Sequence, residues 1–66
     1  MLKLLDVVKL LVDYPEHGLL RGAVGTVIYE FPASELVYEI EFSNDKGETI
    51  VQIALRSEDV ALYLEP

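Results

Sequence analysis

The sequence contains no cysteine and no tryptophan, a single histidine and only five basic residues. Without cysteine the chain forms no disulfides, and His17 alone lacks the thiolate or second imidazole ligands of a typical zinc site. We predict that the protein holds no cofactor and no metal. A domain of 66 residues has a marginal core, so its stability must come from apolar packing or from a partner chain.

Basic residues are not only few but also scattered, whereas acidic residues give the chain a formal net charge of −7. The five bases are Lys3, Lys9, Arg21, Lys46 and Arg56. Nucleic-acid-binding proteins usually concentrate such residues in a basic patch that displaces counterions from phosphate. Binding to nucleic acid is therefore not expected, and the acidity also disfavours anionic membranes.

A long uninterrupted hydrophobic run is absent as well. The apolar first twelve residues are broken by Lys3, Asp6 and Lys9, and no signal-peptide cleavage site follows them. The run falls short of the roughly 20 apolar residues that cross a membrane. Together with the lack of cysteine, this predicts a cytoplasmic location and no contact with membranes.

Apolar residues are abundant, at 52% of the chain, and they follow the pattern of short strands separated by turns. The clearest strand is residues 36–42, where Tyr38, Ile40 and Phe42 alternate with two glutamates. Strict alternation is typical of a strand with one side on a core and the other in water. We therefore expect these three side chains to be buried.

Four more strands and one helical turn are expected from similar signals. Gly47 suits the left-handed position that closes a hairpin loop after residues 36–42. A helix over the first twelve residues is the alternative to a first strand, because leucine and valine also recur there at helical spacing. The expected strands are residues 6–12, 23–31, 48–55 and 60–65, and the expected turn is residues 56–59.

Gly25 lies inside the second predicted strand, a position typical of a bulge or a sharp bend. Such a bend would let Val24 and Val27 both point inward, and would direct Tyr29 and Phe31 to the same inner face. Five short strands, a long early loop and a turn before the last strand predict one all-β domain over residues 1–66, closed into a small barrel.

Four segments of the chain carry a resemblance to known proteins: Asp6-Val7-Val8, Pro15-Glu16-x-Gly18-Leu19, Gly22-x-x-Gly25-Thr26-Val27 and Tyr38-x-Ile40-Glu41-Phe42. Through them, residues 4–62 resemble a group of short bacterial proteins that share a domain of unknown function. The resemblance implies an SH3-like barrel and no activity. Together with the strands and the turn expected above, the predicted fold is a five-stranded SH3-like barrel with a short 3-10 turn before the last strand.

The segment around Gly22 and Gly25 is also similar to two other kinds of SH3-like barrel. Its likeness to the glycine-bearing strand of KOW modules implies nucleic-acid binding as an alternative function. Its likeness to small barrels that dock on ferredoxin-dependent complexes implies, as a second alternative, a subunit of an enzyme or electron-transfer complex.

The apolar excess favours protein–protein contact. One face of each strand fills the barrel, so the apolar side chains on the other face are not buried by the barrel itself. Contiguous exposed apolar residues mark interfaces. We predict a non-catalytic protein that acts as a homodimer or as an accessory subunit, unless the loop and the termini fold back over these residues. The candidate interface residues are Val7, Leu11, Leu19, Leu20, Ile28 and Val37.

The loop of residues 13–22 is the candidate binding loop, because binding loops sit on rigid scaffolds. His17 beside Glu16 forms a minimal acid–base pair. The loop holds no serine or cysteine as a nucleophile, so we predict that the protein is not an enzyme. The candidate loop residues are Tyr14, Glu16, His17 and Arg21.

Overall fold

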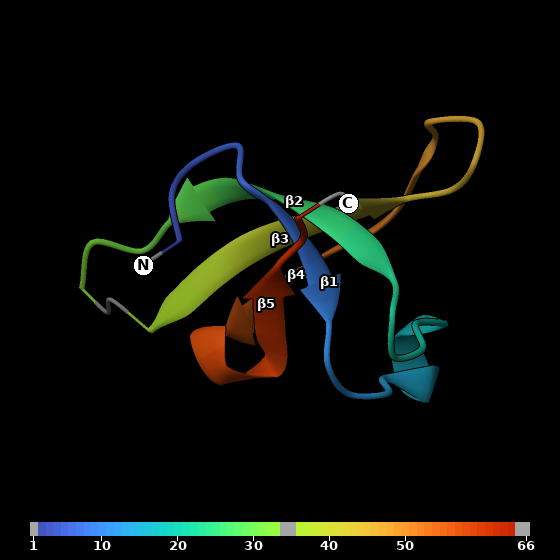
Figure 1. The fold of residues 1–66 in the computed structure, drawn as a ribbon, viewed down its shortest axis with the longest axis horizontal. Coiled ribbons are helices and arrows are strands. Elements are labelled where there is room, and N and C mark those ends of the chain that lie inside the picture. The colour runs from blue at the N-terminus through green and yellow to red at the C-terminus, as the bar shows by residue number, and fades with distance from the viewer. Residues whose placement is uncertain (1, 34–35, 65–66) are drawn as a thin grey trace.

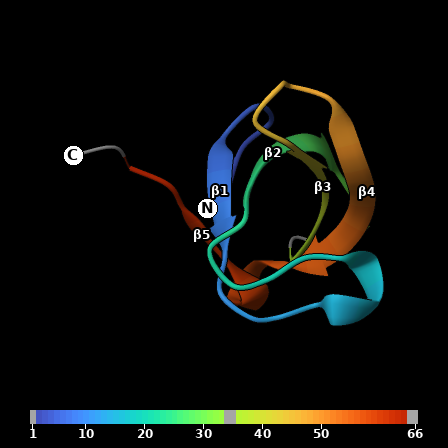
Figure 2. The same cartoon turned by 90° about the vertical axis from the view of Figure 1, so that its right-hand side faces the viewer.

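The structure is a computed structural model that describes residues 2–33 and 36–64. Five antiparallel strands form one sheet in the order β4-β3-β2-β1-β5, curled into a barrel (Figures 1 and 2). The strands and 3-10 turns are β1 (Val7–Leu10), η1 (Pro15–His17), β2 (Val24–Glu30), β3 (Val37–Ser43), β4 (Thr49–Arg56), η2 (Ser57–Asp59) and β5 (Val60–Leu62). This confirms the predicted all-β, SH3-like barrel with a 3-10 turn before the last strand.

The first strand is β1, so the helical alternative for the N-terminal segment is wrong. Val8 and Leu10 point into the barrel and are buried, whereas Val7 and Lys9 face outward. The strand is shorter than predicted and Val12 is exposed, because the chain leaves the sheet after Leu10. The last strand is also short and ends at Leu62, while residue 65 of the predicted strand lies outside the described residues.

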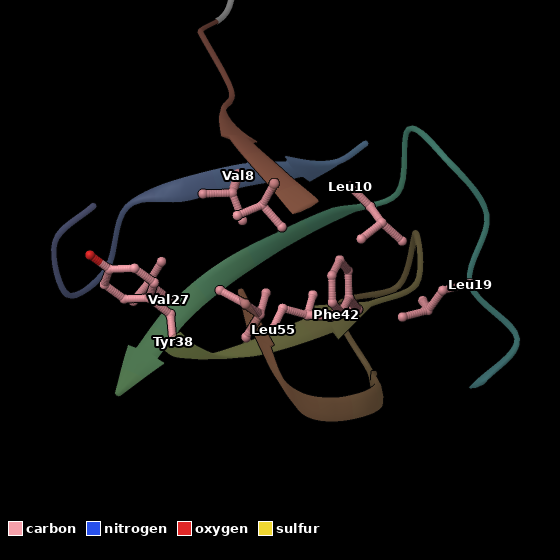
Figure 3. Close-up of a cluster of buried hydrophobic side chains, with 9 residues drawn as sticks. Val8, Leu10, Leu19, Val27, Tyr38, Phe42 and Leu55 are labelled. Atoms are coloured by element: carbon pink, nitrogen blue, oxygen red, sulfur yellow. The ribbon is translucent and has the colours of Figure 1, made fainter. Parts of the chain in front are cut away.

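The core confirms the alternation predicted for β3. Tyr38, Ile40 and Phe42 are all buried and lie inside the barrel. The tight turn after β3 is also as predicted, with Gly47 at a φ of 81°. Figure 3 shows the cluster that fills the barrel, which consists of Val8, Leu10, Leu19, Val27, Tyr38, Ile40, Phe42, Leu55 and Val60.

Gly25 does not form the predicted bulge. It stands in regular register between Val8 on β1 and Phe42 on β3. A Cβ atom there would lie 2.7 Å from Ile40 Cγ2 and 2.9 Å from the Glu41 carbonyl oxygen. The residue is glycine because neighbouring atoms already occupy the space of a side chain. Regular alternation then leaves Val24 exposed, contrary to the prediction that it points inward.

The irregularity of β2 lies at Ile28 instead. Val27 pairs with Ile40, and Tyr29 pairs with the next residue along β3, Glu39, so the register shifts between Val27 and Tyr29. An extra residue of this kind reverses which side chains face the core. Tyr29 is consequently 50% exposed, not buried as predicted.

Replacing Gly25 by alanine should strongly destabilise the fold, because the backbone oxygen of Glu41 cannot move aside without disrupting β3. We expect Gly25→Ala to lower the free energy of unfolding by about 2 kcal/mol or more. Gly47→Asn is the matched control, because asparagine tolerates the left-handed backbone and the site has open space. Urea unfolding, with sucrose added if the variant is unfolded in buffer, measures both; equal stability of the two variants would contradict the explanation.

Candidate protein-contact surfaces

The loop that follows β1 is ordered by its own hydrogen bonds (Figure 1, cyan). Tyr14 and Leu19 exchange two backbone hydrogen bonds, of 2.8 and 3.1 Å. Between them η1 ends at His17 and is capped by Gly18, which adopts a left-handed conformation with a φ of 71°. The Asp13 carboxylate accepts the Arg21 backbone N–H at 2.7 Å. The loop is thus a folded element on the barrel.

Leu19 is in the core, and its prediction as an interface residue is therefore wrong. Its side chain is 3% exposed and lies in the cluster with Phe42 and Leu10 (Figure 3). The hydrogen bonds with Tyr14 bring this part of the loop back over the open end of the barrel. At Leu19 the loop folds back on the barrel, which is the alternative that the sequence analysis left open.

Tyr14 connects the loop to η2. Its hydroxyl donates to Asp59 Oδ2 at 3.1 Å, and the Leu11 backbone N–H donates to the Asp59 carbonyl oxygen at 2.8 Å. Burial raises the pKa of the Tyr14 phenol, and the hydrogen bond and negative charge of Asp59 raise it further, against the opposing charge of Arg56. The sequence contains no local signal for this contact, because the two residues are 45 positions apart.

The other candidate loop residues lie at the surface. Glu16, His17 and Arg21 are exposed, and the rings of Tyr14 and His17 are tilted at 6.2 Å between centroids. No three of the described histidine, aspartate and glutamate side chains gather into a metal-ion site. That this loop binds a ligand or partner remains a prediction.

The remaining interface candidates are not all on one face. Leu20 and Val7 are exposed, whereas Leu11, Ile28 and Val37 are half-buried. Val7 lies in the same cross-strand row as Glu41 of β3, and Val37 is four residues earlier on β3, about 13 Å away by strand rise. Val7 and Val37 are therefore separate apolar positions on the barrel, whereas Ile28 follows Val27 of β2, which bonds to the segment just before Val7.

An exposed apolar surface does occur beside the first turn of the chain. Leu4 and Leu5 are 52% and 70% exposed, yet their backbone is held firmly. The Lys3 N–H donates to the Asp6 carboxylate at 2.8 Å, and the Leu5 N–H donates to the Val27 carbonyl oxygen at 2.7 Å. These bonds fix the two leucines against the side of β2.

Two neighbouring segments extend this surface. The Tyr63 N–H donates to the Val7 carbonyl oxygen at 2.8 Å, so Tyr63 follows β5 alongside the start of β1. The Leu4 N–H donates to Glu30 Oε2 at 3.2 Å, which places its backbone near the end of β2, the strand that also carries the exposed Tyr29. We call the set the terminal apolar surface, and its residues are Leu4, Leu5, Val7, Tyr29 and Tyr63.

Leu5 is the unusual member of the terminal apolar surface. Its φ of 72° is the one positive value among the described non-glycine residues. Left-handed backbone costs a residue with a Cβ about 1–2 kcal/mol, and such outliers cluster at functional positions. Sequence reasoning noticed the apolar excess but had no signal for this backbone state, nor for the exposure of Tyr29.

Comparison with known proteins identifies a family but no characterised relative. The sequence model of the family described as Domain of unknown function (DUF4926) matches residues 4–62. No curated protein and no solved structure matches the chain. In the described ranges, no helix has the length and apolar character needed to cross a membrane.

Tyr14→Phe should remove a pH-dependent part of the stability. At pH 7 we expect a loss of about 0.5–1.5 kcal/mol, because the hydrogen bond to Asp59 disappears. The raised pKa means that the folded chain holds the phenol proton more tightly than the unfolded chain does. This contribution is complete below the unfolded pKa of about 10 and is lost as the pH rises through the folded pKa.

Urea unfolding at pH 7 and at steps above pH 9 measures this effect, with the exposed Tyr29→Phe as control. The difference between wild type and Tyr14→Phe should shrink as the pH rises, while that for Tyr29→Phe stays small. A difference for Tyr14→Phe that does not change with pH would contradict the assignment.

Proposed function

The chain belongs to the family described as Domain of unknown function (DUF4926), and we propose that it acts without catalysis, through protein–protein contact. It would serve as a homo-oligomer or as an accessory subunit of a larger cytoplasmic assembly. The contact would be made by the terminal apolar surface. The single observation that carries this proposal is Leu5, an exposed leucine held in a left-handed backbone conformation.

The cost of the Leu5 conformation supports a role outside the monomer. A glycine or asparagine would adopt the same backbone with less strain and would expose less apolar area. In the monomer the leucine side chain contributes little to the core, since it is 70% exposed. Burial against a partner would instead contribute roughly 1.5–3 kcal/mol for such a side chain.

The exposure of the other members of the terminal apolar surface supports the same proposal. Leu4, Val7, Tyr29 and Tyr63 are 52%, 41%, 50% and 37% exposed. An apolar patch of this kind is typical of an interface that is covered in the working state.

Charge at the edge of the terminal apolar surface would influence the choice of partner. Asp6 and Glu30 accept hydrogen bonds from the backbone of the first turn, so both carboxylates lie at this surface. A partner with basic residues around an apolar centre would complement them. The basic residues of the chain itself stand in separate segments, which offers no specific support for the KOW-like alternative.

Leu5→Asn should separate contact from stability. Asparagine tolerates the left-handed backbone, so the free energy of unfolding should stay unchanged or rise by up to about 1 kcal/mol. Loss of the buried leucine should weaken association about tenfold or more. Sedimentation at micromolar concentration measures self-association, and capture from an extract of the source organism measures binding of another subunit.

Leu20→Asn is the matched control, because Leu20 is 64% exposed and lies in the loop after β1. This loop is bonded to Leu10 through Gly22, at the opposite end of β1 from Leu5 and Val7. Leu20→Asn should leave association unchanged. Two results together would contradict the proposal. The wild type would sediment as a single chain, and it would capture the same proteins from the extract as Leu5→Asn does.

A further inference from the structure

A second surface with unpaired groups is the free edge of β4. Among the described residues, β4 pairs with β3 on one side and has no strand on the other. It is one of the longest strands and carries a single charged residue, Arg56, in the sequence TIVQIALR. A long, apolar, unpaired edge is the feature by which sheets join to other strands.

The register shows which backbone groups face that edge. The Ser57 N–H donates to the Leu36 carbonyl oxygen, so this pair belongs to the hydrogen-bonded set of the β3–β4 ladder. In an antiparallel ladder such pairs alternate with non-hydrogen-bonded ones. Gln52, Ala54 and Arg56 belong to the other set, so their N–H and C=O groups point to the free edge, and all three residues are exposed.

We propose that two copies of the chain pair through β4, antiparallel, with Ala54 opposite its own copy. Gln52 then lies opposite Arg56 of the second copy, in both directions. This inference rests on the proposed function, because it names a second copy as one partner. It adds β4 as a second contact, separate from the terminal apolar surface.

The position of the irregularity in the β3–β4 ladder selects this register. Phe42 pairs with Val51, and Ser43 pairs with Thr49, so Ile50 is an extra residue that breaks the ladder. A pairing centred on Gln52 would place Ala54 opposite this broken point. A pairing centred on Ala54 uses only residues 52–56, where the β3–β4 ladder is regular. The outward N–H and C=O groups of Gln52, Ala54 and Arg56 then each face a partner in the second copy.

Charge favours the same register. Glu41 stands beside Gln52 on β3, in the same cross-strand row. When Arg56 of the second copy joins this row next to Gln52, its backbone lies two strand spacings from Glu41, about 9.6 Å. The long arginine side chain can then reach over Gln52 to the Glu41 carboxylate. The contact occurs twice by symmetry, and no like charges are placed opposite each other.

Two substitutions and their combination test the pairing. Arg56→Glu brings a carboxylate next to Gln52 and Glu41 of the other copy, and Gln52→Arg places two arginines opposite each other. Each should raise the dimer dissociation constant about tenfold, because the altered contact is repeated. The double variant restores opposite charges and should recover the wild-type dissociation constant.

Within one chain the two positions are four residues apart on a strand, about 13 Å by strand rise, so an effect inside the monomer would not produce this recovery. Sedimentation equilibrium measures the constants, with Arg21→Glu as a control that makes the same charge change in the loop. Ala54→Pro is a second test, because it removes an outward N–H and leaves the β3 ladder intact.

The outcomes separate the two proposals. Recovery in the double variant, together with a monomeric Ala54→Pro that keeps the wild-type circular dichroism, supports β4 pairing. A dimer that withstands all β4 changes but dissociates in Leu5→Asn overturns the pairing and leaves the proposed function standing. A wild type that remains monomeric at about 100 µM also overturns the pairing, whether or not it captures another protein.

Discussion

The close approach of β2 to β3 at Gly25 is the constraint on which the barrel depends. Because no side chain stands there, the Phe42 ring and Ile40 fill the space between the strands, and Val8 of β1 closes the same row from the other side. A core this small leaves little room to repack around an added methyl group. The position of β1 over the barrel, and hence of the turn before it, follows from this contact.

Most of the fold could be predicted from the sequence because alternation is a local signal. Tyr38, Ile40 and Phe42 were recognisable without knowledge of their neighbours, and Gly47 was recognisable from its hairpin context. Gly25 was misread because a glycine in a strand fits either a bulge or a close contact. The cross-strand neighbours decide between them, and the sequence does not show which residues these are.

The candidate surfaces were less accessible to prediction, since they depend on contacts between distant segments. Leu19 is buried because its hydrogen bonds with Tyr14 return the loop to the core, and loop sequences carry no signal for such a return. The contact between Asp59 and Tyr14 has no local signal, because the two residues lie far apart along the chain. The exposure of Tyr29 follows from an extra residue at Ile28, for which composition and spacing carry no mark.

The pairing of β1 with β5 has a consequence for how the chain is made. Val8 pairs with Leu62, and Leu10 pairs with Val60, so β1 of the barrel is synthesised well before its partner β5. Until Val60–Leu62 leave the ribosome, the backbone N–H and C=O groups on one edge of β1 have no native partner strand. Contacts between such distant positions slow folding, so this domain must complete its barrel after synthesis of its final strand, and the nascent chain passes through a stage that is open to misassembly or to chaperones.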